Sequence, residues 1–487
     1  MRGVVTAGGR RASGALALVS LLLATSCNFA PAYVQPAMPV PGQYAAASPP
    51  GQSIARLDWQ QFFPDPQLRS LIAQALANNR DIRIATARVA EARAAWRIQG
   101  APLYPQLDAV ATGTRGRSVT TLPGLGTQAF DVRQITAQLS ASWEIDFWGR
   151  VRNLREAARE QFLATEEARR AVATDLVAQV ALGYLLEREF EERFALARRS
   201  VATREDTLRI MRRRYEVGSG SKFEREQAQV LLSQAQTVLQ ALEQDRAVNR
   251  NALALLVGQP VSIPPGTLGL ARDAREFALP VGLPSELLVN RPDIVAAEHR
   301  LRAANADIGA ARAAFFPNIS LTGALGTSST ALSGLFGSDS ATWSFTPTLV
   351  APLFDAGRLR GNLEATRARR DAAVADYERT IQSAFRDVSD ALVRREQLAK
   401  QVATTRILLD AQRERARLAQ LRFDYGRSTY LEVLDAQRDL FEAEQALVQL
   451  RRAEFASIVA LYAALGGGFA PNSNFDAGRQ QGEGQMR

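Results

Sequence analysis

Apolar residues recur at spacings of three and four along residues 293–316, and this spacing predicts a helix that packs on one face. The stripe consists of Ile294, Ala297, Leu301, Ala304, Ile308, Ala311 and Phe315. Residues 82–96 carry a matching stripe of Ile82, Ala85, Val89, Ala92 and Trp96. Alternating steps of three and four are the heptad pattern of coiled-coil packing. Pro105 and Pro317 follow the two stripes and predict where the helices end, because proline cannot continue a helix.

The hydrophobic period changes from 3.5 to two after each proline, which predicts β-strands. We expect strands at about 105–115 and 133–147, and at about 317–327 and 342–354, separated by loops rich in Gly, Ser and Thr. Alternating segments of about ten residues are also typical of strands that cross a membrane. Four strands cannot close a barrel, so strands of this kind in lipid would require several chains to share one.

Two very long helices are predicted next, at about 150–214 and 358–422. Neither segment contains proline, and each contains a single glycine, Gly183 or Gly361. About 65 residues in a helix span roughly 100 Å, which exceeds a compact domain and indicates a stalk or a tube. Each long helix is followed by a glycine turn and a return helix, at about 221–256 and 429–465.

The chain repeats itself. Residues 78–107 align with residues 290–319 at an offset of 212. The glycines Gly149, Gly218 and Gly258 align with Gly357, Gly426 and Gly466 at an offset of 208. We therefore predict two copies of one helix, β-hairpin, long helix and helix unit, at 59–260 and 285–466, joined by a linker at 261–284 and followed by a flexible tail at 467–487.

The N-terminus has the pattern of an export signal that ends at a lipidated cysteine. Arginines precede an apolar stretch that ends in LLLATSC, and Cys27 is the only cysteine of the chain. This predicts a lipoprotein signal peptide at 1–26, an N-acyl diacylglycerol lipid on Cys27, and an extended anchored segment at 27–58. The alternative is an ordinary secretory signal with an incidental cysteine. After residue 26, no apolar run is long enough for a membrane-spanning helix.

Composition argues against an enzyme and against a nucleic-acid partner. The 59 basic residues are almost all arginines, and they interleave with 50 acidic residues along the helices, which indicates solvated, salt-bridged faces. One histidine and one cysteine exclude most metal sites and nucleophile arrangements, so we expect no metal and no other cofactor. We interpret His299 as a surface or interface residue rather than a ligand.

Three stretches together resemble the TolC family of outer-membrane channels, in its lipoprotein branch that serves RND-type efflux pumps. They are RPDIVAAEHRLRAANADIGAARAAFFPNISLTG, LVAPLFDAGRLRG and RFDYGRSTYLEVLDAQRDLFEAEQAL. The resemblance implies a mainly α fold with a membrane β-barrel, formed by a homotrimer with twelve strands and continued by a periplasmic α-helical barrel. It also implies the outer membrane of a Gram-negative bacterium, with a periplasmic adaptor and an inner-membrane RND pump as partners.

The resemblance places the functional residues at the two glycine turns. Carried over by motif, Leu431, Glu432 and Asp435 would line the narrowest rings of the channel and gate passive conduction. Residues at the periplasmic tips would also contact the adaptor; they are Gly218, Lys222, Glu224, Arg225, Gly426, Arg427 and Ser428. In some relatives an acidic residue at the position of Glu224 locks the closed tip by pairing with a basic residue where this chain has Ser428, and Arg427 is the substitute available here.

Two other functions remain open at this point. One is a duct for type I protein secretion, which the lipoprotein signal disfavours. The other is a soluble periplasmic coiled-coil scaffold, in which the alternating segments would be ordinary hairpins. Efflux of soft metal ions is disfavoured, because four methionines and one histidine supply few ligands.

Overall fold

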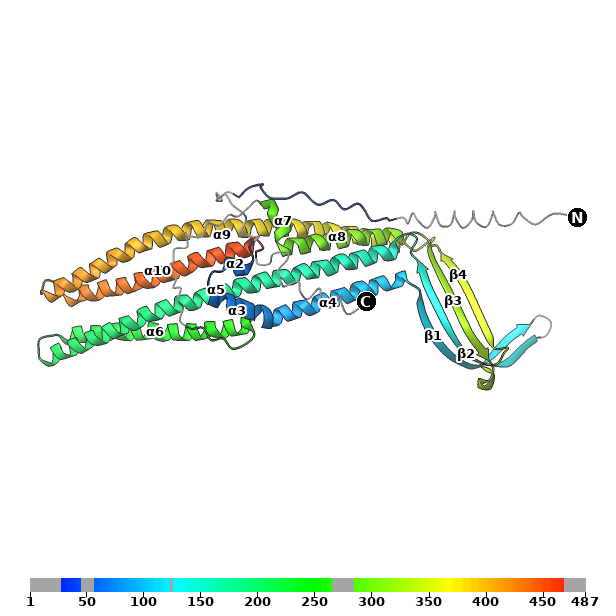
Figure 1. The fold of residues 1–487 in the computed structure, drawn as a ribbon, viewed down its shortest axis with the longest axis horizontal. Helices are drawn as coiled ribbons and strands as arrows, with labels where there is room; N and C mark the ends of the chain where they lie inside the picture. The colour runs from blue at the N-terminus through cyan, green and yellow to red at the C-terminus, as the bar shows by residue number, and fades with distance from the viewer. Residues whose placement is uncertain (1–27, 45–56, 123–125, 265–283, 468–487) are drawn as a thin grey trace. The chain divides into compact units, whose positions relative to one another are not determined.

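A computed structural model describes residues 28–44, 57–122, 126–264 and 284–467 (Figure 1). The predicted signal peptide, Cys27 and the tail from residue 468 lie outside the described residues. The chain forms two compact units. Unit 1 consists of Met1–Pro36, Arg88–Thr165 and Ala297–Tyr377, and unit 2 consists of Ala37–Ala87, Glu166–Ala296 and Glu378–Arg487.

Both halves of the chain contain the same order of α-helices and strands, as the duplication predicts, and they differ in their short 3-10 helices. After α2 (Trp59–Phe62), the first half runs α3 (Pro66–Asn78), α4 (Arg80–Gly100), η2 (Ala101–Leu103), β1 (Gln106–Leu122), β2 (Gly126–Ile145), α5 (Arg150–Glu216) and α6 (Lys222–Val257). The second half runs η4 (Pro284–Glu286), α7 (Leu287–Asn290), α8 (Pro292–Ala313), β3 (Asn318–Ser329), η5 (Leu332–Gly334), β4 (Ala341–Val350), α9 (Arg358–Asp424) and α10 (Tyr430–Ala464). The mainly α fold with a single antiparallel sheet is confirmed.

The long helices α5 and α9 are each 67 residues long, which corresponds to about 100 Å at 1.5 Å per residue. Each is uninterrupted and ends within two residues of the predicted position. No helix within the described ranges combines the length and apolarity needed to cross a membrane.

Unit 1 contains an open antiparallel sheet with the strand order β1-β2-β3-β4. Figure 1 shows the strands side by side at the end of α4, α5, α8 and α9. The β1–β2 pairing extends from Gln106↔Ser142 to Leu122↔Gly126. In β3–β4 the pairing extends from Asn318↔Val350 to Thr327↔Ala341. Strands β1 and β4 each have one neighbour and are the edges of the sheet.

The ends of the strands differ from those that alternation predicts. Residues 116–122 and 126–132 were expected in a loop, but they extend the first hairpin, because backbone pairing continues without an alternating side-chain pattern. The last strand ends at Val350, two residues before Pro352. Pro347 nevertheless lies inside β4, opposite Leu321. An edge strand can accommodate a proline because its missing N–H can face away from the neighbouring strand.

The N-terminal segment Asn28–Pro36 lies along α8 in unit 1, and we call it the strap. The ring of Phe29 stacks on that of Phe316, with centroids 4.6 Å apart. Side chains of Asn305 and Arg312 donate hydrogen bonds of 2.7 and 3.1 Å to backbone carbonyls of the strap. The strap therefore holds the residues that follow Cys27 close to the start of β3.

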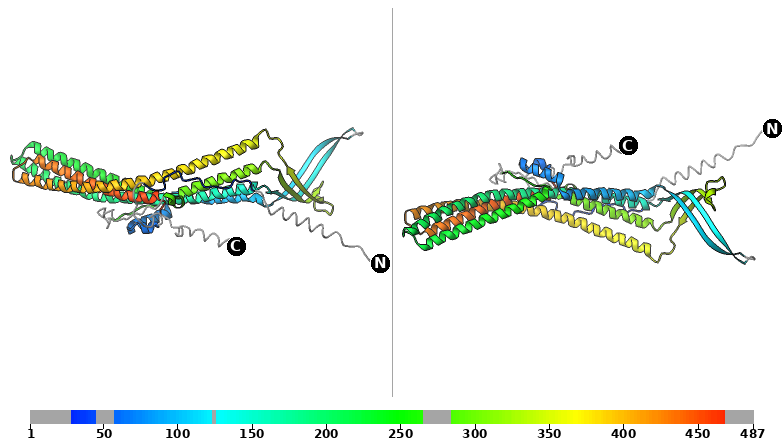
Figure 2. Two further views of the ribbon diagram at one scale, coloured as in Figure 1. Left: turned by 90° about the horizontal axis from the view of Figure 1, so that it is seen from above. Right: turned by 90° about the horizontal axis from the view of Figure 1, so that it is seen from below.

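Unit 2 consists of helical hairpins, in which α6 returns beside α5 and α10 returns beside α9 (Figures 1 and 2). Three consecutive charged residues of α5, Glu187, Arg188 and Glu189, are buried. Each contacts a different element: Glu187 pairs with arginines of α6, Arg188 reaches Gln67 of α3, and Glu189 pairs with Arg452 of α10. Polar contacts from three consecutive residues therefore hold α5 against α6, α3 and α10.

Candidate functional site at the helix turns

The two predicted glycine turns connect the long helices to the return helices within unit 2. Gly218 has φ +76° and Gly426 has φ +66°, a left-handed conformation that L side chains adopt at a cost. In the first turn the N–H of Ser219 donates to the carbonyl of Arg214 at 2.8 Å. In the second, the N–H of Arg427 donates to the carbonyl of Arg422 at the same distance. Both turns are therefore the Schellman ending of a helix.

The helices after the turns begin differently. The Ser221 hydroxyl accepts from the N–H of Glu224 at 3.1 Å, and the Glu224 carboxylate accepts from the N–H of Ser221 at 2.9 Å. This reciprocal pair is a capping box. Thr429, which occupies the position of Ser221 in the second repeat, makes no side-chain cap bond. The carboxylate of Glu224 thus stabilises its own helix.

The expected link from Glu224 to the second turn is not present between the described residues of one chain. Arg427 forms no ion pair with any of them, and the hydroxyl of Ser428 is buried without a hydrogen-bond partner there. The sequence contained the reason for the difference, since Ser221 and Glu224 have the S-x-x-E spacing of a capping box.

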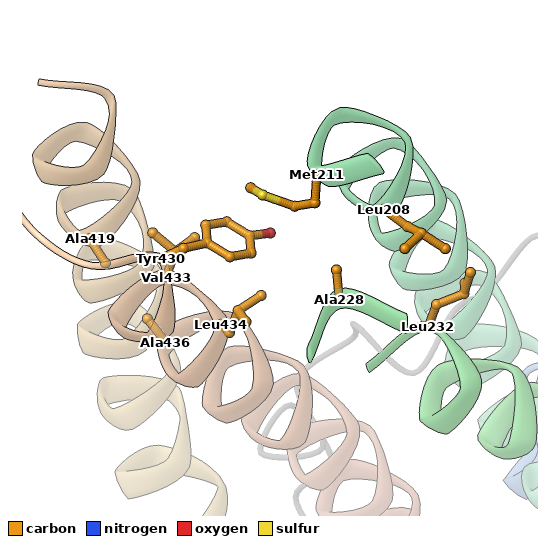
Figure 3. Packing of buried hydrophobic residues seen from close by; sticks show 9 residues of the cluster. All are labelled: Leu208, Met211, Ala228, Leu232, Ala419, Tyr430, Val433, Leu434 and Ala436. Atoms are coloured by element: carbon orange, nitrogen blue, oxygen red, sulfur yellow. The ribbon is translucent and has the colours of Figure 1, made fainter. Parts of the chain in front are cut away.

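A buried cluster joins the two hairpins just behind the turns (Figure 3). It consists of Leu208, Met211, Ala228, Leu232, Ala419, Tyr430, Val433, Leu434 and Ala436. The members come from α5, α6, α9 and α10, so the cluster holds both turns in one place. Burial raises the pKa of Tyr430, whose ring lies 5.0 Å from that of Phe423. The sequence interpretation missed Tyr430, Val433 and Leu434, although their i, i+3, i+4 spacing marks a packed face.

The proposed constriction residues occupy the opposite face of α10. Leu431 is 46% exposed. Glu432 lies 3.5 Å from Arg422, and Asp435 lies 3.5 Å from Arg438. Each carboxylate therefore has an arginine partner within its own chain. A ring of Asp435 side chains around a channel would therefore also contain the positive charge of Arg438.

The remaining tip residues form a charged and apolar surface. Arg225 pairs with Glu226, and its guanidinium lies 4.9 Å from the ring centroid of Tyr215. Lys222 begins α6 and is close enough to Glu226 to help lower the pKa of that carboxyl group, after the larger effect of Arg225. Phe223 is 72% exposed and occupies the position of Leu431 at the offset of 208. The repeat could have identified Phe223, which the motif comparison did not select.

His299 is less exposed than the sequence suggested. Its Nδ1 lies 2.6 Å from a carboxylate oxygen of Glu160, and both side chains are largely buried in unit 1. Burial acts to raise the pKa of Glu160, but the hydrogen bond and charge of His299, with the charges of Arg302 and Arg159, outweigh it and lower the pKa. Within the described ranges, no group of three or more His, Cys, Asp or Glu side chains is arranged to hold a metal ion.

Duplicated long helices, a four-stranded sheet and paired glycine turns define the class of outer-membrane efflux channels. The structure of the open state of the MtrE outer membrane channel of Neisseria gonorrhoeae superposes with a TM-score of 0.81 and 37% identity, over 91% of this chain and 98% of MtrE. The family model of the outer membrane efflux protein matches residues 71–259 and 283–467, which correspond to the two repeats. The chain belongs to the outer membrane efflux protein family.

Two relatives support the same assignment. Outer membrane protein OprJ of Pseudomonas aeruginosa is 42% identical over 471 residues, which cover 94% of this chain and 96% of OprJ. Cation efflux system protein CusC of Escherichia coli K12 is 39% identical over 463 residues, which cover 92% of this chain and 97% of CusC. The resemblance inferred from the sequence is confirmed. The chain is an outer-membrane efflux channel of a Gram-negative bacterium, from a family of transport channels.

Proposed function

We propose that the chain acts as a homotrimer, in which twelve strands close one β-barrel in the outer membrane and the long helices form an α-helical barrel across the periplasm. The open sheet carries this proposal. Its edges, β1 and β4, are 17 and 10 residues long and leave backbone groups without a neighbouring strand in the sheet. Unpaired backbone groups are costly in lipid, so β1 of one copy would pair with β4 of the next.

As an exit duct, the trimer would passively conduct small molecules such as drugs from a periplasmic adaptor and an inner-membrane RND pump to the exterior. Cross-linking in intact cells, followed by purification in detergent, tests this assignment. We expect an adaptor and an RND pump to co-purify with the channel. Recovery of a type I secretion partner instead would favour a secretion duct, and recovery without detergent in a soluble fraction would favour a scaffold.

The gate assignment predicts a change in conductance. Replacing Leu431 and Asp435 with alanine should raise single-channel conductance several-fold in planar bilayers, because it removes an apolar constriction and a ring of charge. A matched control is Leu408→Ala with Asp410→Ala on α9. Leu408 is 48% exposed, and Asp410 lies 3.5 Å from Arg413, just as Asp435 lies 3.5 Å from Arg438. Equal conductance of the wild type and the Leu431/Asp435 variant would exclude these residues from the gate.

We further propose that Cys27 carries an N-acyl diacylglycerol lipid that tethers the chain but does not alone hold it in the membrane. The strap supports this, because two side chains of α8 and the ring of Phe316 contact the segment that follows Cys27. Cys27→Ala, exported with an ordinary signal peptidase site, should lose palmitate labelling while trimers are still extracted from outer membranes by detergent. A fully soluble variant would contradict the barrel.

A further inference from the structure

A cavity of about 410 Å³ lies at the end of α4 in unit 1, just before β1. It is lined by Trp96, Arg97, Gly100, Ala101, Tyr104 and Arg155. The chain passes from helix to strand beside the cavity, since α4 ends at Gly100 and β1 begins at Gln106. The side chain of Arg155 lies over Gly100, where an added Cβ would be 3.3 Å from its Cδ, so a larger residue would crowd the arginine.

The positive charge of the cavity is not neutralised by the chain. Arg97 and Arg155 make no ion pair with any described residue, and the lining contains no carboxylate. Nearby arginines behave differently. Arg150 lies 2.6 Å from Glu144, and Arg152 lies 3.1 Å from Asp146. Two unpaired guanidinium groups in one concave site favour an anionic ligand, and guanidinium geometry matches a phosphate well.

The aromatic residues of the cavity supply an amphipathic surface beside the two arginines. The indole Nε1 of Trp96 is buried and has no hydrogen-bond partner among the described residues. The Trp96 ring stacks on Phe162 at 5.9 Å, and the guanidinium of Arg155 lies 5.8 Å from its centroid. Tyr104, which also lines the cavity, is largely exposed. Aromatic rings with a polar edge are typical of membrane–water interfaces, where lipid headgroups lie.

The second repeat shows how the corresponding position is covered by protein. At the offset of 212, Arg97, Gly100 and Tyr104 correspond to Gly309, Arg312 and Phe316. There the strap covers the end of α8, with Phe29 stacked on Phe316 and its carbonyl bonded to Arg312. Phe316 is consequently 36% exposed, whereas Tyr104 is 68% exposed. The strap thus covers one of two equivalent positions, and the other retains an open, cationic cavity.

We propose that this cavity binds the phosphate of an anionic glycerophospholipid of the periplasmic leaflet, between Arg97 and Arg155. The inference rests on the proposed function, which places the start of β1 at the membrane surface. Basic cavities beside membrane segments recognise anionic headgroups in this way. The cavity volume is within the range of small-ligand sites.

The test measures binding of dioleoyl phosphatidylglycerol and dioleoyl phosphatidylcholine to delipidated trimers in detergent, by native mass spectrometry and by thermal unfolding. We expect phosphatidylglycerol to bind and stabilise the wild type more than phosphatidylcholine. Arg97→Gln with Arg155→Gln should lose about 25-fold in affinity for phosphatidylglycerol, because each arginine near an anionic membrane contributes about fivefold. The matched control, Arg88→Gln with Arg367→Gln, removes two exposed arginines of unit 1 and should change affinity less than twofold.

Four results would overturn the inference. Equal affinity for the two lipids would remove the role of headgroup charge. Displacement of the lipid by inorganic phosphate at equal concentration would identify a site for free phosphate. Lower trimer stability of the Arg97/Arg155 variant in lipid-free detergent, without a loss of lipid affinity, would identify a contact between copies. Wild-type trimers that conduct but do not bind phosphatidylglycerol would refute this inference alone, whereas absence of trimers and conductance would refute the proposed function.

Discussion

Replacing Glu187 with alanine is expected to destabilise the protein by about 2–3 kcal/mol, because charge-assisted hydrogen bonds between a buried carboxylate and two partly exposed arginines would be lost. The Glu187 side chain is 1% exposed. One carboxylate oxygen accepts from Nε of Arg246 at 2.8 Å and from both Nε and a terminal nitrogen of Arg250, at 3.0 and 2.8 Å. Alanine would leave two partly buried guanidinium groups without their counter-ion, and the charges that join α5 to α6 would repel each other.

Thermal unfolding of the trimer in detergent measures this effect. The matched control is Glu396→Ala, which removes the partner of Lys400 at 2.6 Å on the exposed face of α9. Both of those side chains are more than half exposed, so the control should lose between zero and about 1 kcal/mol. If the two variants lost equal stability, the Glu187 contacts would have no special contribution to packing between α5 and α6.

Replacing Gly466 with alanine is expected to destabilise the protein by about 3 kcal/mol, although only one methyl group is added. Gly466 has φ +78°, and an added Cβ would lie 2.5 Å from the carbonyl oxygen of Asn290 and 2.8 Å from the Cα of Arg291. The left-handed backbone contributes about 1 kcal/mol of this loss and the clash with backbone atoms about 2 kcal/mol. Gly258 has the same geometry against Asn78 in the first repeat, at 2.6 Å, and should behave alike.

The glycines of the two turns distinguish the cost of the left-handed backbone from the cost of the steric clash. Gly218 and Gly426 have similar positive φ values, but no atom lies within 4 Å of an added Cβ. Alanine at either position should therefore lower the stability only by the cost of the left-handed backbone, about 1 kcal/mol. Thermal unfolding of the four variants in parallel makes the comparison. Losses of the same size at Gly426 and Gly466 would show that the close approach of Asn290 is relieved by movement.

The order of the elements could be predicted from the sequence because the same pattern occurs in both repeats. Offsets of 212 and 208 located equivalent prolines and glycines, and long segments without proline located α5 and α9. The ends of the β-hairpins were harder to predict from the sequence. Pairing at Val119↔Ala129 depends on backbone hydrogen bonds between strands, and the side-chain pattern there has no clear period. Helix ends are set by single residues, whereas strand ends depend on a partner elsewhere in the chain.

At the turns, motif comparison found exposed residues and missed the packing that supports them. Leu431 and Asp435 were selected, but Tyr430 and Val433, which hold α10 against α5 and α9, were not. The partners of charged side chains were also hidden. For Glu224 two signals in the sequence disagree: the S-x-x-E spacing with Ser221 predicts a capping box, whereas the family motif predicts a link across the tip. In the structure Glu224 and Ser221 form the capping box.

The strap has a consequence for the order of events during export. Residues 28–36 lie early in the chain, yet the side chains that bind Pro31 and Phe29, those of Asn305 and Arg312, follow 274 and 283 residues later. Contacts so distant in sequence form late in folding. The segment that follows Cys27 must therefore remain undocked until α8 has been translocated. A chain truncated before residue 305 would lack these strap contacts. The strap can therefore bind to α8 only after most of the polypeptide has been exported.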